Sequence, residues 1–295
     1  MPKLNTQSLD KLKKMKKKNE FTFVFFGDTR GTGGKNQIAP ELKDIIKQIN
    51  GLKSTPAFVL HGGDIANTGT IRNFDNFLSI IGPVSDRIPF FVIPGNHEVY
   101  QPDKTKNQFN LANFHEKFGP DKFVIRVPAS FNFQVLAENN ITDLPPIPRK
   151  NNKNIKDVHY GFDVQNISAM EAIVRNRSGR SIIAFHAPPD INKCWGTHGM
   201  GPNQTQRFLK GVVDKHPHKI PLILTSHIHG FSVDKRGSTS YVLSGGGGAP
   251  FETACVHRII NFVVFRVTST SITYQVHWRL RNEKTWKVTK TIKVQ

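Results

Sequence analysis

The sequence predicts an α/β protein, and three observations support this prediction. Short apolar segments rich in Val, Ile and Phe are typical of strands that are buried on both faces. Segments with apolar residues at helical spacing lie between them. Polar residues follow the ends of the apolar segments, which is where open α/β sheets bind ligands. The apolar segments lie at residues 21–26, 57–60, 89–93, 181–185 and 221–224.

Three helices are predicted in the first part of the chain, and each has apolar residues on one face. The first begins after Pro40, and the second is expected to end at Gly82 and Pro83, because these residues break helices. The third lies around residues 107–118. Their apolar faces contain Leu42, Ile45, Ile46 and Ile49 in the first, Phe74, Phe77, Leu78 and Ile81 in the second, and Phe109, Phe114 and Phe118 in the third.

The second half of the chain is expected to add a long loop, a helix and three strands. Residues 128–157 have weak periodicity and many Pro and Asn residues, and we expect them to form an inserted loop. The spacing of apolar residues predicts a helix over residues 205–216. The remaining apolar segments predict antiparallel strands over residues 241–243, 259–267 and 271–278.

The chain has 295 residues and an excess of basic residues that gives a formal charge of +19. Because no linker is evident, residues 21–295 are expected to form one domain, preceded by a flexible basic arm over residues 1–20. The arm contains the sequence KLKKMKKK at residues 11–18. A charge of this size attracts acidic substrates or surfaces, so phosphate esters, nucleic acids and anionic membranes all fit.

The sequence is expected to belong to a soluble, cytoplasmic protein without a membrane span. No apolar stretch as long as that of a signal peptide precedes Phe21, and no run of roughly eighteen apolar residues occurs. Only Cys194 and Cys255 are present, which suits a reducing compartment and two unpaired thiols. A single disulfide between them is the alternative.

Oxygen and imidazole side chains follow the apolar segments at the predicted edge of the sheet. They are Asp28, Asp64, Asn96 with His97, His186, and His227 with His229. Hydrolysis of a phosphate ester needs an activated water, neutralised phosphate oxygens and a proton for the leaving group. Two divalent ions about 3.5–4 Å apart supply the first two. Carboxylate, amide and imidazole ligands suit Mn, Fe, Zn or similar ions, so the sequence predicts a phosphoesterase with two metal ions.

The motifs and their order resemble those of the calcineurin-like metallophosphoesterases. From about Phe21 to Pro250, the segments GDTR, GDIAN, GNHE, FHAPP and SHIHG follow the order and spacing of that family. The resemblance implies a four-layer α-β-β-α sandwich with two central mixed sheets. It also implies a metal-dependent hydrolase of phosphate monoesters or diesters.

The resemblance further implies a role for each motif residue. The implied metal ligands are Asp28 and His229 for the first ion, Asn96, His186 and His227 for the second, and Asp64 as the bridge. A hydroxide that bridges the ions would attack phosphorus, and His97 would protonate the leaving oxygen. Asn96 is also expected to contact the substrate.

Two positions depart from the family pattern. Arg30 replaces a metal-binding histidine, and its guanidinium cannot bind a metal because it stays protonated. We expect Arg30 to bind the substrate phosphate, with an ion pair to Asp28 as the alternative. Asn67 stands where purple acid phosphatases have tyrosine and protein phosphatases have aspartate. It could orient His97 through a hydrogen bond or offer its amide oxygen to a metal.

One further residue and two other functions complete the expectations. His198, in a loop after the His186 segment, is expected to contact the substrate. The charge of +19 leaves a nuclease or a cyclic-nucleotide phosphodiesterase open, but nucleic acid is not favoured because basic and aromatic residues do not alternate. The departures at Arg30 and Asn67 leave a non-catalytic scaffold with this fold as another alternative.

Overall fold

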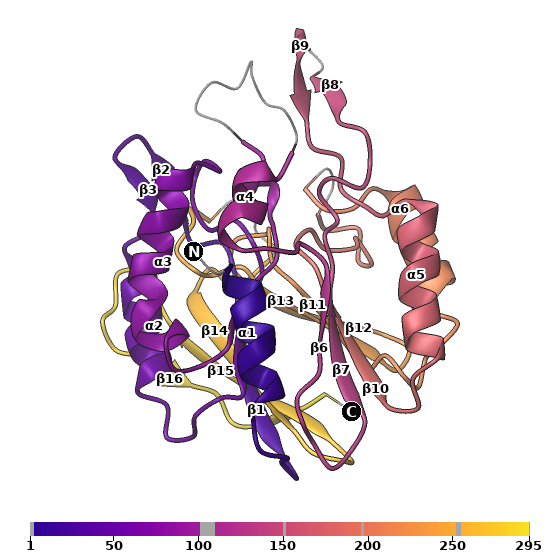
Figure 1. The fold of residues 1–295 in the computed structure, drawn as a ribbon. Coiled ribbons are helices and arrows are strands. Elements are labelled where there is room, and N and C mark those ends of the chain that lie inside the picture. Colours follow the sequence, from indigo (N-terminus) through magenta and orange to yellow (C-terminus); the bar gives the residue numbers. More distant parts are fainter. Residues whose placement is uncertain (1–2, 101–109, 150–151, 196–197, 252–254, 295) are drawn as a thin grey trace.

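Two β-sheets face each other at the centre of the molecule, and helices cover their outer faces (Figure 1). The structure is a computed structural model and describes residues 3–100, 110–149, 152–195, 198–251 and 255–294. Both sheets contain parallel and antiparallel pairs. The predicted four-layer α-β-β-α sandwich with two central mixed sheets is therefore confirmed. No helix in these ranges is long and apolar enough to cross a membrane.

The first sheet is built around β1 (Phe21–Phe26), which pairs in parallel with β4 (Phe58–His61) and antiparallel with β14 (Ile260–Val267). These strands consist mainly of Phe, Val, Ile and Leu because both faces of the sheet are covered. The sheet continues with β5 (Phe90–Val92) beyond β4, and with β15 (Ile272–Arg279), β16 (Lys287–Val288) and β17 (Ile292–Lys293) beyond β14.

The second sheet has the strand order β12-β13-β11-β10-β7-β6. Its strands are β6 (Phe123–Ile125), β7 (Phe133–Ala137), β10 (Arg180–Ala184), β11 (Leu222–Thr225), β12 (Phe231–Arg236) and β13 (Thr239–Ser244). Because β7 lies within residues 128–157, the expectation of an inserted loop there is wrong. Its polar Gln134 interrupts the apolar pattern, but this buried side chain donates a hydrogen bond to Ser181 at 3.0 Å. The expected antiparallel pairing holds for β14 and β15, whereas β13 is parallel to β11 and antiparallel to β12, a strand that was not predicted.

Helices lie on the outer face of each sheet (Figure 1). On the first sheet they are α2 (Glu41–Asn50), α3 (Ile71–Ser85) and α4 (Ala112–Lys117), while α1 (Leu4–Lys13) lies along the β5 edge of this sheet. On the second they are α5 (Val164–Arg175) and α6 (Pro202–Phe208), followed by the π-helical turn η3 (Leu209–Val213). α3 continues through Pro83, because a proline in the last turn removes only one hydrogen bond. Residues 107–109 of the third predicted helix, including Phe109, lie outside the described residues.

Two hairpins project beyond the sheets at the same edge of the molecule (Figure 1). One consists of β2 (Arg30–Gly33) and β3 (Asn36–Ile38), and the other of β8 (Ile147–Arg149) and β9 (Asn152–Asp157).

Between the sheets the core is rich in phenylalanine. The ring of Phe23 stacks against those of Phe58 and Phe265, with centroids 4.8 and 4.9 Å apart. Such packing gives the strand ends a rigid support.

The N-terminal residues differ from the flexible arm that we expected, because residues 4–13 form α1 and pack on β5. The Asn5 side chain is buried, accepts the N–H of Val92 and donates to the Val92 carbonyl, both at 2.9 Å. Ser8 makes the equivalent pair of hydrogen bonds with Phe90. β5 is the last strand on this side of the sheet. Asn5 and Ser8 of α1 thus form hydrogen bonds with backbone groups of β5 that would otherwise pair with a neighbouring strand.

Asn5→Ala is expected to lower the free energy of unfolding by about 3 kcal/mol, because it leaves buried backbone groups of Val92 without a partner. Urea denaturation followed by circular dichroism measures this change. Gln7→Ala, on the same helix and only partly buried, is the control and should change the free energy by less than about 0.5 kcal/mol. Equal effects of the two variants would contradict the assigned role of Asn5.

Candidate metal centre

The carboxyl ends of four parallel-paired strands bring the predicted site residues to one edge of the molecule. Asp28 follows β1, Asp64 follows β4, His186 follows β10 and His227 follows β11. Asp28, Asp64 and His227 have positive φ angles of 60°, 55° and 70°. Residues other than glycine rarely adopt this conformation, which costs roughly 1–3 kcal/mol and is found mainly at functional sites.

The structure forms two groups of side chains that could each hold a metal ion. Asp28, Asp64 and His229 form one group, and Asp64, His186 and His227 form the other, with ligand atoms within 4.8 Å of one another. Asn96 joins the second group, since its Oδ1 lies 3.2 Å from His186 Nε2. All six predicted ligands therefore lie together. Asp64 is shared by both groups, which is the geometry expected of a bridging ligand.

The hydrogen bonds of two histidines support metal binding. His186 Nδ1 donates to the Gly62 carbonyl at 2.7 Å, and His229 Nδ1 donates to the Pro250 carbonyl. A carbonyl can only accept, so the proton of each neutral ring is on Nδ1 and the lone pair is on Nε2. These Nε2 atoms lie 3.4 Å from Asp64 and 3.7 Å from Asp28, respectively. Metal-binding histidines are typically oriented in this way, so the residues fit two divalent ions.

Arg30 points toward the shared carboxylate. Its Nε lies 3.7 Å from Asp64 Oδ2, so the ion pair found here involves Asp64, where the sequence suggested Asp28 as the alternative partner. Burial disfavours the charged form of Asp64, but the nearby charges of His97, His186 and Arg30 outweigh burial and hold its pKa below the usual range. Arg30 therefore places a positive charge beside the carboxylate that both groups share.

His97 is oriented by the backbone of Asn67 and not by its side chain. His97 Nδ1 donates to the Asn67 carbonyl at 2.8 Å, and His97 Nε2 lies 3.9 Å from Asp64 Oδ2. Burial lowers the pKa of His97, and the Asp64 carboxylate opposes this effect. The Asn67 amide nitrogen instead faces Gly33, lying 3.0 Å from the point where a Cβ of that residue would be. The departure at position 67 therefore leaves the orientation of His97 intact.

Glu98 and Tyr160 are parts of the site that the sequence did not identify. Glu98 is buried and accepts hydrogen bonds from the N–H groups of Gly95 at 2.6 Å and Asp64 at 2.8 Å. Burial and the neighbouring Asp64 raise the pKa of Glu98, while these N–H groups oppose the rise. The Tyr160 ring lies 4.7 Å from that of His227. Glu98 could have been found from the sequence, because it is a charged residue directly after Asn96 and His97. No sequence pattern marks Tyr160.

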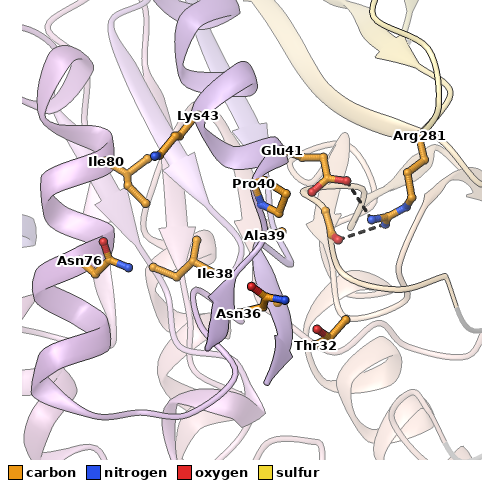
Figure 2. A pocket seen from close by; sticks show the side chains of 12 residues that line it. Thr32, Asn36, Ile38, Ala39, Pro40, Glu41, Lys43, Asn76, Ile80 and Arg281 are labelled. Atoms are coloured by element: carbon orange, nitrogen blue, oxygen red, sulfur yellow. Dashed lines mark hydrogen bonds and ion pairs between the residues drawn. The ribbon is translucent and has the colours of Figure 1, made fainter. Parts of the chain in front are cut away.

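Arg281 anchors the glycine-rich turn over residues 244–250 to helix α2 (Figure 2). Its Nη2 donates to the carbonyls of Gly248 and Ala249 at 3.0 and 2.7 Å, and its Nη1 pairs with Glu41 at 2.9 Å. The N–H of Ala249 in turn donates to the Asp28 carbonyl at 3.0 Å. The arginine therefore fixes the backbone that supports Asp28. Beside it lies a cavity of ≈ 420 Å³ lined by the β2–β3 hairpin, the start of α2 and the middle of α3.

A disulfide joins two loops near the site. Cys194 pairs with Cys255, with their Cα atoms 6.2 Å apart, so the expectation of two unpaired thiols is wrong. The two cysteines are distant in the sequence but meet in the fold, because both loops pack around Ile228. Ile228 is the residue between the predicted ligands His227 and His229 in the sequence. His198 lies on the first of these loops, is exposed, and its backbone N–H donates to the Trp195 carbonyl at 2.9 Å. Burial is the main cause that lowers the pKa of His227, and the charges of His186 and, to a smaller extent, His229 and His198 add to the decrease.

Glu138 is expected to make the protein less stable as the pH rises from 4.5 to 8. Burial raises its pKa from 4.5 to about 8, with Lys122 opposing and Asp143 adding to the rise. Over that range the unfolded chain loses the proton while the folded chain keeps it, so stability falls with increasing pH. Glu138→Gln removes the effect and should raise Tm by several degrees at pH 9, but not at pH 4.5.

Thermal unfolding of Glu138→Gln at these two pH values tests this prediction. Glu116→Gln, at an exposed position, is the control and should shift Tm at neither pH. An identical Tm shift of Glu138→Gln at both pH values would show that Glu138 keeps an ordinary pKa.

The two facing mixed sheets, with acidic and histidine side chains grouped at their strand ends, define a protein of the metallophosphoesterase fold class. A sequence profile of the calcineurin-like phosphoesterases matches residues 21–231, and the chain belongs to this family. The resemblance drawn from the motifs is therefore confirmed.

Curated relatives match only short segments of the chain. A probable glycerophosphodiester phosphodiesterase, GpdQ, from Arcobacter nitrofigilis is 32% identical over 83 residues, which cover 28% of this chain and 29% of the relative. GpdQ of Enterobacter lignolyticus is 36% identical over 55 residues, which cover 19% of each chain. The match thus spans less than a third of the length of either relative.

Solved structures with low sequence identity share the fold. GAP50, described as the anchor in the inner membrane complex of Plasmodium, superposes with a TM-score of 0.60 at 14% identity, covering 94% of this chain and 90% of its own. PhoD superposes with a TM-score of 0.58 at 11% identity, covering 95% of this chain and 72% of its own.

Proposed function

We propose that this protein hydrolyses phosphate monoesters or diesters with two divalent metal ions. The observation that carries the proposal is the position of Asp64, whose carboxylate belongs to both potential metal groups. Membership of the calcineurin-like phosphoesterases and the short matches to phosphodiesterases support it.

Six residues would hold the ions, which we propose to be Mn, Fe, Zn or similar. When bound, such ions neutralise phosphate oxygens and lower the pKa of water to near neutrality. Asp28, His229 and Asp64 would hold the first, and Asp64, Asn96, His186 and His227 the second. Asp64 is held in place independently of any ion, because its backbone N–H is bound by Glu98 and its Oδ1 accepts the N–H of His97 at 2.9 Å.

Side chains around the two metal groups would bind the substrate and protonate its leaving oxygen. Arg30 places a guanidinium beside Asp64, where a phosphate could accept two hydrogen bonds from it. His97, fixed by the Asn67 carbonyl, would give its proton to the leaving oxygen. Asn96 would contact the phosphate, in keeping with its position in the second group, and His198, on the exposed loop that follows β10, would contact the outer part of the substrate.

Arg30→Ala is expected to raise KM for an aryl phosphate about tenfold to a hundredfold, because a charge-assisted hydrogen bond contributes about 1.5–3 kcal/mol. Bound metal should be unchanged. Arg30→Lys should restore part of the affinity, and Arg72→Ala, at an exposed position at the start of α3, is the matched control. Unchanged KM in Arg30→Ala would remove Arg30 from the substrate site.

The central test combines metal analysis with turnover. The purified protein should bind about two Mn ions and hydrolyse p-nitrophenyl phosphate or its bis ester when Mn is present. Absence of both bound metal and activity would overturn the proposal. Assays with RNA, DNA and a cyclic nucleotide separate the nuclease and cyclic-nucleotide phosphodiesterase alternatives from a general phosphoesterase.

A non-catalytic scaffold is the second candidate. It is favoured by Arg30 in place of a metal-binding histidine and by the likeness to GAP50, which is described as an anchor. The fixed orientation of His97 weighs against it, since a scaffold needs no proton donor. Bound metal without turnover of any ester would favour the scaffold.

The expected cytoplasmic location remains a prediction, and one observation weighs against it. Reducing compartments seldom preserve disulfides, so the bond between Cys194 and Cys255 favours an oxidising compartment. Thiol labelling of the protein from its native cell would decide between the two.

A further inference from the structure

The lysines that follow α1 lie on a fixed surface at the end of the molecule opposite the metal centre. The N–H of Lys18 donates to the Pro128 carbonyl at 3.0 Å, and the N–H of Ser130 donates to the Lys18 carbonyl at 2.8 Å. These bonds hold the segment against the turn between β6 and β7. That turn and the start of β1 lie far from the hairpins that flank the site (Figure 1).

We call this surface the basic pole; it consists of Lys13, Lys14, Lys16, Lys17, Arg126 and Arg266, all of which are exposed. Arg126 directly follows β6, and Arg266 lies on β14 beside the start of β1, where Phe21 pairs with Val267. Lys13 is paired with Asp10 at 2.9 Å, and Arg266 with Glu20 at 2.5 Å. Within the described residues, Lys14, Lys16 and Lys17 have no ion-pair partner.

We propose that the basic pole docks the protein on an anionic lipid surface. Groups of four to eight Lys and Arg residues attract anionic head groups, and each contributes roughly fivefold to binding. Lysine predominates in the pole, and its compact charge suits a surface of mobile head groups better than a fixed pattern of acceptors. The backbone hydrogen bonds of Lys18 already hold the lysine segment in place, so little conformational entropy of the chain is lost on binding.

Nucleic acid is negatively charged, like an anionic lipid surface, but it fits the basic pole less well. Single strands are bound by exposed aromatic rings on which bases stack. Among the described residues, none of the exposed large apolar side chains is aromatic. A docked pole also leaves the metal centre facing away from the surface, so this inference does not depend on the proposed activity.

Sedimentation with vesicles tests the proposal. The protein should bind vesicles of phosphatidylcholine with 30% phosphatidylserine in 0.1 M salt, but not vesicles of phosphatidylcholine alone. The variant K14E/K16E/K17E should bind at least about fiftyfold more weakly. The control K43E/K47E/K284E changes three exposed lysines elsewhere, and both variants lower the formal charge by six, from +19 to +13. Equal Tm values would show that both variants fold.

Three results would overturn the proposal. The first is equal binding to both kinds of vesicle, and the second is an equal loss in the two variants, which would mean that net charge alone acts. The third is binding of a DNA or RNA duplex in preference to anionic vesicles, with loss in K14E/K16E/K17E. Retained binding in the control and loss in K14E/K16E/K17E with anionic vesicles would support docking through the basic pole.

Discussion

Asp64→Asn is expected to remove bound metal and to lower phosphate-ester turnover at least about a thousandfold, because metal ions contribute several kcal/mol to such reactions. Asp64 is the residue that both metal groups share, so its replacement affects both. Asparagine has the same shape and can still accept the N–H of His97. The loss should therefore arise from the missing charge and not from a rearranged loop.

Elemental analysis and titration with Mn measure this effect directly. Asp86→Asn, at an exposed position after α3, is the matched control and should keep two ions. Thermal unfolding without metal separates binding from folding, since Asp64→Asn should stay folded when its metal is lost. If Asp64→Asn retained both ions, Asp64 would not be a ligand of both, even though it lies in both groups.

His97→Ala is expected to lower kcat about a hundredfold to ten-thousandfold for an alkyl phosphate, the range that general acids supply. The loss should be much smaller for p-nitrophenyl phosphate, because its leaving group departs without a proton. His97 is neither in the Asp28 group nor in the His186 group, so bound metal should be unchanged.

The comparison of the two substrates is the decisive measurement for His97. His115→Ala, which changes an exposed histidine paired with Asp121, provides the control. An equal loss with both leaving groups would assign His97 a role in binding or structure. Loss of metal in His97→Ala would point to the same conclusion.

The sequence predicts the strand ends of this site well because each end is a local pattern. An apolar segment followed by Asp28 or Asp64 specifies both a buried strand and the edge where its polar residue lies. The order of the motifs along the chain then predicts which residues meet. The structure accordingly brings together all six predicted ligands, whose roles as ligands stay predictions until metal is measured.

The remaining features depend on contacts that no local pattern contains. The orientation of His97 comes from a backbone carbonyl, so the identity of Asn67 is not informative. Arg281 reaches the glycine-rich turn from a distant part of the chain. β7 was missed because Gln134 interrupts its apolar pattern, and its partner Ser181 is 47 residues away.

The packing of α1 on β5 has a consequence for association between molecules. An uncovered outer strand offers its N–H and carbonyl groups to a strand of another chain, which is a common route to aggregation. Asn5 and Ser8 occupy these groups on Val92 and Phe90. The helix therefore blocks addition of a foreign strand at this side of the first sheet.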